Sequence, residues 1–567
     1  MNAITLTRAR ESRAAIERLY IEMRHVFNRG SYRNISQPGE VLPEALLTLA
    51  PEIYGSVGDP LKVELAGLVY VIDRSPKGIE DCRFVKLISE EGYADSGFEV
   101  LIPAARRRRC YRIDQDHMFI EVTRGRSEIY DVLTHLTFMY MEANKIMEHA
   151  TDEEGHPTFE WLKLEEIVEG EIKLTEKNRE VAFSFLSTIL GRSFAETKSA
   201  YERLAAQPEK NSGLFEVVYG LGRTAMAEKY KHKSREITFS PTLRDRLGHH
   251  IYGERWAQNF KGVLQEKGLL DRPLHIISAN MHSVMNSFYA YPALRKQYKE
   301  EPSIEQLALD LQNPRSVEGR RKVMDYALNH GMYSLEDPAG TNISVQLFDT
   351  AQLDAKQLSP EIQFPSGKSA AERPVILVMD YAFGEQAFET MDEMLKPYSE
   401  PETGQKIYVN VESISIMGKA GILDGAKGDI MVPCAHIFEG TADNYPFDND
   451  FTKEDFAHAG VHVCEGPMIT VLGTSLQNRD VLSYFKESSW GAIGLEMEGA
   501  HYQKAIQAAS RIRKNVSPDV TLRYAYYASD NPLLTGSTLA SGSLGAVGVR
   551  PTYLITLKIL ERIIGSE

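Results

Sequence analysis

From about residue 236 onward, short apolar runs alternate with helical segments, and this alternation constrains the fold more than any other feature of the 567-residue chain. The first runs are Leu274–Ser278 (LHIIS), Asn342–Phe348 (NISVQLF) and Pro374–Met379 (PVILVM). Short apolar strands that alternate with helices are typical of a buried parallel or mixed sheet with helices on both faces. We therefore predict an α/β fold, a three-layer α/β/α domain with a mixed sheet, over residues 236–567.

The same alternation continues to the end of the chain. The further predicted strands are Ser413–Met417, Asp429–Val432, Met468–Leu472, Ala492–Leu495 and Thr521–Tyr527. The predicted helices include Ser283–Tyr291, Glu385–Leu395 and Thr552–Ile564. In sheets of this kind, sites form in the loops that leave the carboxyl ends of the strands. Those loops are therefore where chemistry is expected.

The first 235 residues follow a different pattern. Residues 1–150 are predicted as an α+β domain, with helices at Glu11–Val26 and Ser127–His149 and strands at Leu61–Ile72, Phe98–Ile102 and His117–Val122. Residues 151–235 carry apolar residues at helical spacing, and the charged stretch Lys229–Arg235 is predicted as the linker to the α/β domain. These patterns assign no role to this region.

Charge and cysteine usage exclude several classes of function. A net charge of −15 argues against broad binding of nucleic acid or anionic membrane, because both require a positive field. The four cysteines are scattered without a C-x-x-C pair, which fits a reducing compartment and no structural zinc. No stretch reaches the roughly 18 apolar residues of a membrane helix, and the first residues lack the apolar run of a signal peptide. We therefore expect a cytoplasmic protein without a metal or cofactor.

Two carboxylates flank a methionine where a predicted strand enters a helix, in Gly494–Ala500 (GLEMEGA). One of Glu496 and Glu498 must face inward, where it needs a partner. A carboxylate that points into a pocket is well suited to accept both hydroxyls of a ribose.

A Ser-Asp-Asn-Pro sequence, Ser529–Pro532, follows the predicted strand at 521–527. These residue types also favour a simple turn. Its position behind a buried strand makes Asp530 a candidate general acid. A purine leaves a sugar easily only when its ring nitrogen is protonated, and a carboxyl group with a raised pKa donates such a proton.

Two further segments are candidates for ligand contact. Gly418 and Gly421, in the predicted loop Gly418–Asp429, permit close approach of a ligand, although a plain turn explains them as well. Asn280 and His282 follow the first predicted strand and precede a helix, whose free N–H groups are suited to an anion.

Taken in order, three of these segments resemble motifs of the nucleoside phosphorylase and nucleosidase superfamily, most closely those of AMP nucleosidase. They are GKAGIL at 418–423, LEMEGA at 495–500 and ASDNP at 528–532. Asn531 departs from the pattern, which has a lysine there. The resemblance covers roughly residues 240–567 and marks residues 291–340 as an insertion. It implies a nucleoside-phosphorylase-like domain in a homo-oligomer that cleaves the N-glycosidic bond of a purine nucleotide or nucleoside, with hydrolysis favoured over phosphorolysis.

The resemblance also implies roles for single residues. Asp530 is implied to protonate the purine with Ser529 orienting it, and Glu498 to bind the 2′- and 3′-hydroxyls. Met497, beside Glu496, is implied to pack on the sugar. The other candidates for substrate contact are Glu496, Gly418, Ala420, Gly421, Asn280, His282 and Arg479. Three residues are candidates for holding a 5′-phosphate: Arg479, Lys419 and His282.

Two hypotheses from other classes remain open. In the first, the chain is a non-catalytic nucleotide-binding or sensor protein that reuses the fold. In the second, it is a scaffold whose N-terminal region recruits partners. Only the enzyme would release free base from a purine nucleotide or nucleoside, so that release distinguishes it from the sensor and from the scaffold. Phosphate is a further candidate ligand.

Overall fold

The computed structural model describes residues 3–33, 39–363, 369–441, 443–458, 460–534 and 544–565. These residues form two compact units, an N-terminal unit of residues 2–249 with 475–481 and a C-terminal unit of residues 250–474 with 482–567. The division follows His249, whereas the sequence placed it after Arg235. The reason is strand β6 (Glu236–Phe239), which pairs with β1 (Ser31–Arg33) and β2 (Phe84–Ile88) and so belongs to the N-terminal sheet.

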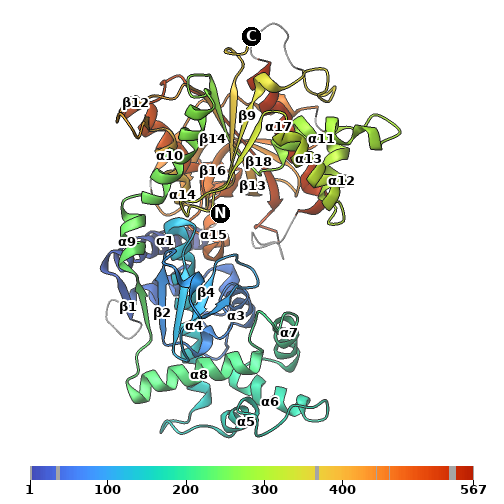
Figure 1. Cartoon of the computed structure of the whole chain (residues 1–567). Coiled ribbons are helices and arrows are strands. Elements are labelled where there is room, and N and C mark those ends of the chain that lie inside the picture. Colours follow the sequence, from blue (N-terminus) through green and yellow to red (C-terminus); the bar gives the residue numbers. More distant parts are fainter. Residues whose placement is uncertain are drawn as a thin grey trace. The chain divides into compact units, whose positions relative to one another are not determined.

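The N-terminal unit combines one mixed sheet with helices. Its strand order is β1-β6-β2-β5-β4-β3, where β3 is Glu99–Leu101, β4 is Cys110–Arg112 and β5 is His117–Glu121. The helices are α1 (Ala3–Arg29), α2 (Val41–Leu49), α3 (Leu65–Ile72), α4 (Gly125–Ala150), α5 (Phe159–Val168), α6 (Arg179–Leu190), α7 (Phe194–Ala205), α8 (Leu214–Lys231) and α9 (Pro241–Gly248). The predicted helices at 11–26 and 127–149 are therefore confirmed as parts of α1 and α4 (Figure 1).

The predicted strand at 61–72 is wrong, because residues 65–72 form helix α3. The Glu64 side chain accepts hydrogen bonds from the N–H groups of Ala66 and Gly67 and so begins the helix. Nearly every residue of α3 is buried. A short helix that is apolar on all sides has no polar face, so its sequence cannot be distinguished from that of a buried strand by periodicity.

The C-terminal unit is built on a ten-stranded mixed sheet with the order β15-β14-β16-β17-β13-β7-β10-β9-β8, and β18 pairs with β13 and β14. The strands are β7 (Leu274–Ser278), β8 (Met332–Leu335), β9 (Val345–Asp349), β10 (Val375–Met379), β13 (Val411–Ile422), β14 (Ile430–Phe438), β15 (Asn444–Pro446), β16 (Val463–Thr470), β17 (Gly494–Glu496) and β18 (Thr521–Asp530). Strands β13, β18, β14, β16 and β17 pair in a closed ring. All the strands predicted for this unit are present.

Alternate residues of the central strands enter two separate cores, which confirms the three-layer α/β/α fold with a mixed sheet. On β10, Val375 and Leu377 belong to one core, while Ile376 and Val378 belong to the other. The first core is covered by α10 (Ile251–Glu266), α14 (Gln386–Met394) and α16 (Gly499–Gln507). The second is covered by α11 (Ser283–Leu294), α13 (Val317–Leu328) and α17 (Val549–Ile564) (Figure 1). A sheet buried on both faces explains the continuous apolar runs of its strands.

Residues 291–340, marked as an insertion, contain α12 (Ile304–Gln312), α13 and the edge strand β8. Helix α12 packs against α11 and α17, and α13 packs against α11. The insertion thus extends the layer on one face of the sheet. None of the helices within the described ranges is long and apolar enough to cross a membrane.

Candidate active site

The residues of the first and third motifs lie on adjacent strands. Strands β13 and β18 are parallel, with Gly418 opposite Tyr526 and Gly421 opposite Asp530. The predicted loop at 418–429 is therefore wrong for its first residues, because β13 continues to Ile422. Pairing with β18 extends β13 through Gly418 and Gly421, although glycines favour a turn. An irregularity between Ala420 and Gly421 shifts the register of this pair.

Asp530 lies at the end of β18 and is 5% exposed. The hydroxyl of Ser529 lies 2.5 Å from Asp530 Oδ1 and 3.1 Å from the carbonyl oxygen of Ala420. The other carboxyl oxygen, Oδ2, is buried without a hydrogen-bond partner among the described residues. Burial raises the pKa of Asp530, and the Ser529 hydroxyl, Lys419 and Lys427 oppose that rise. A buried carboxyl group with one open oxygen is well placed to carry a proton.

Glu496 and Glu498 play different parts at the start of α16. Glu496 is buried, and its carboxylate accepts hydrogen bonds from the N–H groups of Glu498 and Gly499 and from the Thr470 hydroxyl. Burial and the neighbouring Glu498 raise the pKa of Glu496. Among the described residues, the hydrogen bonds of the Glu496 carboxylate are internal and hold the turn in place, which does not favour the predicted contact of Glu496 with substrate.

Glu498 is half-buried, whereas Glu496 is buried. The Oε1 of Glu498 accepts a hydrogen bond of 2.9 Å from the backbone N–H of Gly384, and its Oε2 lies 3.3 Å from the N–H of Met497. Gly384 precedes α14 and is 114 residues distant in sequence. Main-chain groups thus contact both carboxylate oxygens, and an ionised carboxylate accepts about four hydrogen bonds in all. Met497 is also half-buried.

The two acidic motifs are close because β13 lies between them. Gly421 of β13 is opposite Leu495 of β17 on one edge and opposite Asp530 of β18 on the other. Neighbouring strands are about 4.8 Å apart, so the backbones of Leu495 and Asp530 are about 10 Å apart. The sheet therefore places Asp530 at the level of Leu495, directly before the Glu-Met-Glu sequence.

Three residues of this region were not identified as site residues from the sequence. His436 of β14 is completely buried, and its Nε2 lies 3.2 Å from the hydroxyl of Tyr526. Burial lowers the pKa of His436 to about 3, so the ring is neutral at neutral pH. The rings of Tyr526 and Tyr381 both border Gly418, 3.7 Å and 3.6 Å from the position that a Cβ atom there would occupy. Nothing in the local sequence distinguishes these residues from core aromatics.

Gly499 has no room for a side chain, and we expect Gly499→Ala to destabilise the protein. A Cβ atom there would overlap the His436 ring and approach Glu496 Oε1. Overpacking of this kind costs about 1–3 kcal/mol, which should appear as a lower midpoint of thermal unfolding. The matched control is Gly262→Ala in helix α10, where the nearest atom to a Cβ is 3.7 Å away. An equal effect of the two substitutions would contradict the assigned contact.

The remaining predicted residues divide into two groups. Asn280 Oδ1 accepts hydrogen bonds from the N–H groups of His282 and Ser283 and so closes the turn that precedes α11. Asn280 and His282 both line a cavity of about 410 Å³ together with Lys419. Arg479 lies instead in the segment that belongs to the N-terminal unit, where its N–H donates to Glu52 Oε1 at 3.3 Å.

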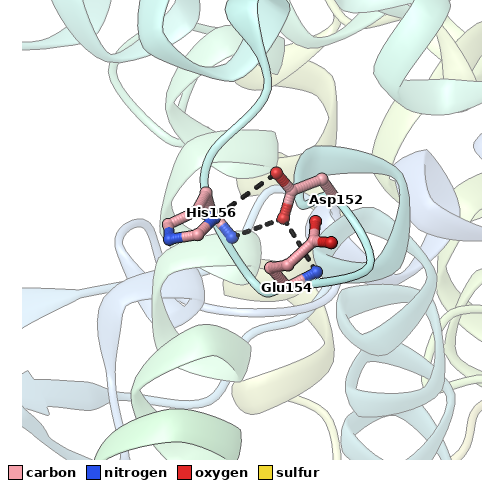
Figure 2. A group of neighbouring side chains, drawn as sticks. All are labelled: Asp152, Glu154 and His156. Carbon is pink, nitrogen blue, oxygen red and sulfur yellow. Dashed lines mark hydrogen bonds and ion pairs between the residues drawn. The ribbon is translucent and has the colours of Figure 1, made fainter.

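A separate group of potential metal ligands lies on the N-terminal unit between α4 and α5, and Figure 2 shows its three side chains, Asp152, Glu154 and His156. All three are exposed. Asp152 accepts hydrogen bonds from the N–H groups of Glu154 and His156 and pairs with the His156 ring at 3.5 Å. These bonds close the turn and account for the cluster, so we assign it no ligand.

Comparison with known proteins identifies a family. The chain matches the family described as a family of unknown function (DUF6909) over residues 41–301 and 306–565, and it belongs to that family. No curated protein matches it.

Similar solved structures include the 5′-methylthioadenosine/S-adenosyl homocysteine nucleosidase of Campylobacter jejuni. It is 11% identical, with 52% of this chain and 100% of that chain covered and a TM-score of 0.31. The futalosine hydrolase of Helicobacter pylori is 11% identical, with 50% and 97% covered and a TM-score of 0.30. Because these scores are low, we infer function from the side chains described above and not from these likenesses.

Proposed function

We propose that the C-terminal unit cleaves the N-glycosidic bond of a purine nucleoside or nucleotide, with hydrolysis of a nucleotide favoured. The observation that carries this proposal is Asp530, a buried carboxyl group oriented by Ser529 with one open oxygen, at the same level of the sheet as Leu495, three residues before Glu498. An acid for the base and a carboxylate for the sugar are the two groups that this reaction needs.

The chemistry assigns one task to each group. Asp530 Oδ2 gives a proton to a ring nitrogen of the purine as the bond from C1′ to the base breaks, and the bonding electrons leave with the base. Glu498 accepts hydrogen bonds from the ribose hydroxyls and stabilises the positive charge that develops on the sugar. A water oxygen then bonds to C1′ and loses a proton, which restores the acid. The rings of Tyr381 and Tyr526 supply an aromatic surface near Gly418.

The test is incubation of the full chain with adenosine 5′-monophosphate, other purine nucleotides and purine nucleosides, each with and without orthophosphate. Chromatography should detect free base, and the sugar product distinguishes water from phosphate as the nucleophile. Nucleotide binding without release of base from any of these compounds would refute the enzyme and favour the alternative, a nucleotide-binding or sensor protein.

A further inference from the structure

Exposed apolar side chains lie along the edge strand of the N-terminal sheet. Among the described residues, β3 pairs with β4 alone and ends the sheet. Val100 in the strand and Phe98 and Ile102 beside it are 45%, 39% and 48% exposed. Alternate residues of a strand point to one face, so this spacing forms an apolar row. An edge strand with an exposed apolar row is a template for pairing with another chain.

The apolar row continues into the sheet but is covered there. Val100 is opposite Tyr111 of β4, and Tyr111 is opposite Phe119 of β5. Tyr93, from the turn before β3, contacts the rings of Tyr111 and Phe119, with centroids 5.8 Å and 5.3 Å away. The chain thus covers the aromatic part of this face itself and leaves the edge exposed. A partner therefore has to approach β3 from the edge.

The charge of the chain changes sign across β3. Asp95, before the strand, is exposed. The arginine run 106–109 follows the strand; Arg106 pairs with Asp131 at 3.0 Å, whereas Arg107 is exposed. When a strand pairs antiparallel with a second copy of itself, the acidic end of each copy lies beside the basic end of the other. A parallel pair would bring like charges together, so the charges favour the antiparallel arrangement.

The apolar row sets the register of such a pair. With a twofold axis at Val100, the two Val100 side chains are opposite each other, and Phe98 of each copy is opposite Ile102 of the other. A shift by one residue would bring Glu99 into the apolar row, because neighbouring residues face opposite sides. Glu99 instead lies on the other face, opposite Arg112 of β4. The sequence around β3 is thus complementary to itself in one antiparallel register.

We propose that β3 is an interface between two copies of this chain, paired antiparallel about a twofold axis at Val100. The two six-stranded sheets then form one continuous sheet. A twofold contact of this kind closes on itself and joins two copies at this surface. Because β3 has three residues, we expect the pairing to depend on protein concentration. This interface lies in the N-terminal unit and is independent of the function proposed for the C-terminal unit.

A cysteine at the axis tests the register directly. Opposite residues of antiparallel strands have Cβ atoms about 4.5–5.5 Å apart, which is close to the spacing of a disulfide. We therefore expect Val100→Cys to form a covalent dimer of the full chain under mild oxidation, detected on a non-reducing gel. The matched control is Leu61→Cys, at an apolar position that is 72% exposed outside β3. The unmodified protein controls for its own exposed Cys434.

The charges at the two ends of β3 give a second measurement in the Val100→Cys background. An exposed ion pair is weak, but a twofold interface contains it twice, so we expect Asp95→Lys to weaken association by about 2- to 30-fold and to slow cross-linking. Addition of Arg107→Glu should restore cross-linking, because it returns opposite charges to both ends of the interface. In otherwise unmodified protein, Val100→Lys should lower the mass measured by sedimentation equilibrium, whereas Leu61→Lys should not.

Cross-linking at Val100 that is no faster than at Leu61 would overturn the interface. Fast cross-linking that Asp95→Lys leaves unchanged would overturn the antiparallel arrangement. Cross-linking that is fast at Val100, slowed by Asp95→Lys and restored by the double substitution would establish both.

Discussion

Asp530→Asn is expected to lower the rate of base release by about 10²- to 10⁴-fold, the usual contribution of a positioned general acid. Asparagine has the shape of the carboxyl group and can still contact Ser529, but its amide does not give up a proton. Binding of the nucleotide or nucleoside should therefore stay within a few-fold of the unmodified protein. Chromatography of the released base and calorimetry of substrate binding measure the two effects separately.

The pH dependence gives an independent check of the same residue. The acid must be protonated to act, so the rate should fall as pH rises through the pKa of Asp530. Burial raises that pKa above the ordinary value for an aspartate, so the fall begins at a higher pH than an exposed aspartate would give. Asp530 would be removed from the mechanism if Asp530→Asn showed the same fall in rate with rising pH as the unmodified protein. Equal activity of the variant and the unmodified protein would have the same consequence.

Glu498→Gln should have the second-largest effect, a loss of about 10²-fold in kcat/KM. Two hydrogen bonds from ribose hydroxyls to a carboxylate are charge-assisted, and each is worth about 1.5–3 kcal/mol. Glutamine keeps the hydrogen bond from Gly384 but removes the negative charge that stabilises the developing cation. Steady-state kinetics on a nucleoside and on its 2′-deoxy analogue should show that the variant no longer distinguishes the two.

Glu496→Gln is the matched control, two residues away in the same motif. Its carboxylate bonds to Thr470 and to the N–H groups at the start of α16, all within the protein. We therefore expect a lower thermal midpoint and less than about a tenfold change in kcat/KM. If Glu496→Gln abolished activity while Glu498→Gln did not, the assignment of the two glutamates would be reversed.

The sequence predicted the central strands of the C-terminal unit because strands such as β7, β9 and β10 are buried on both faces. Val375–Met379 is apolar throughout. A short apolar run of this kind between predicted helices is best explained as a buried strand. The same reasoning failed at Leu65–Ile72, where a short buried helix has the same composition as a strand. It also failed at Gly418–Ile422, where cross-strand pairing overrides the local preference of glycine for turns.

The sequence by itself determined the α/β fold of the C-terminal unit and named Asp530 and Glu498, because local patterning and short motifs suffice for both. Only the tertiary structure decided what those groups contact. The Gly384 N–H donates a hydrogen bond to Glu498, and the register of β13 places Leu495, three residues before Glu498, at the level of Asp530. Arg320, in an insertion without a motif, reaches a cavity shared with Lys419. Contacts between residues that are distant in the chain leave no pattern in the local sequence, because they form only when the chain folds.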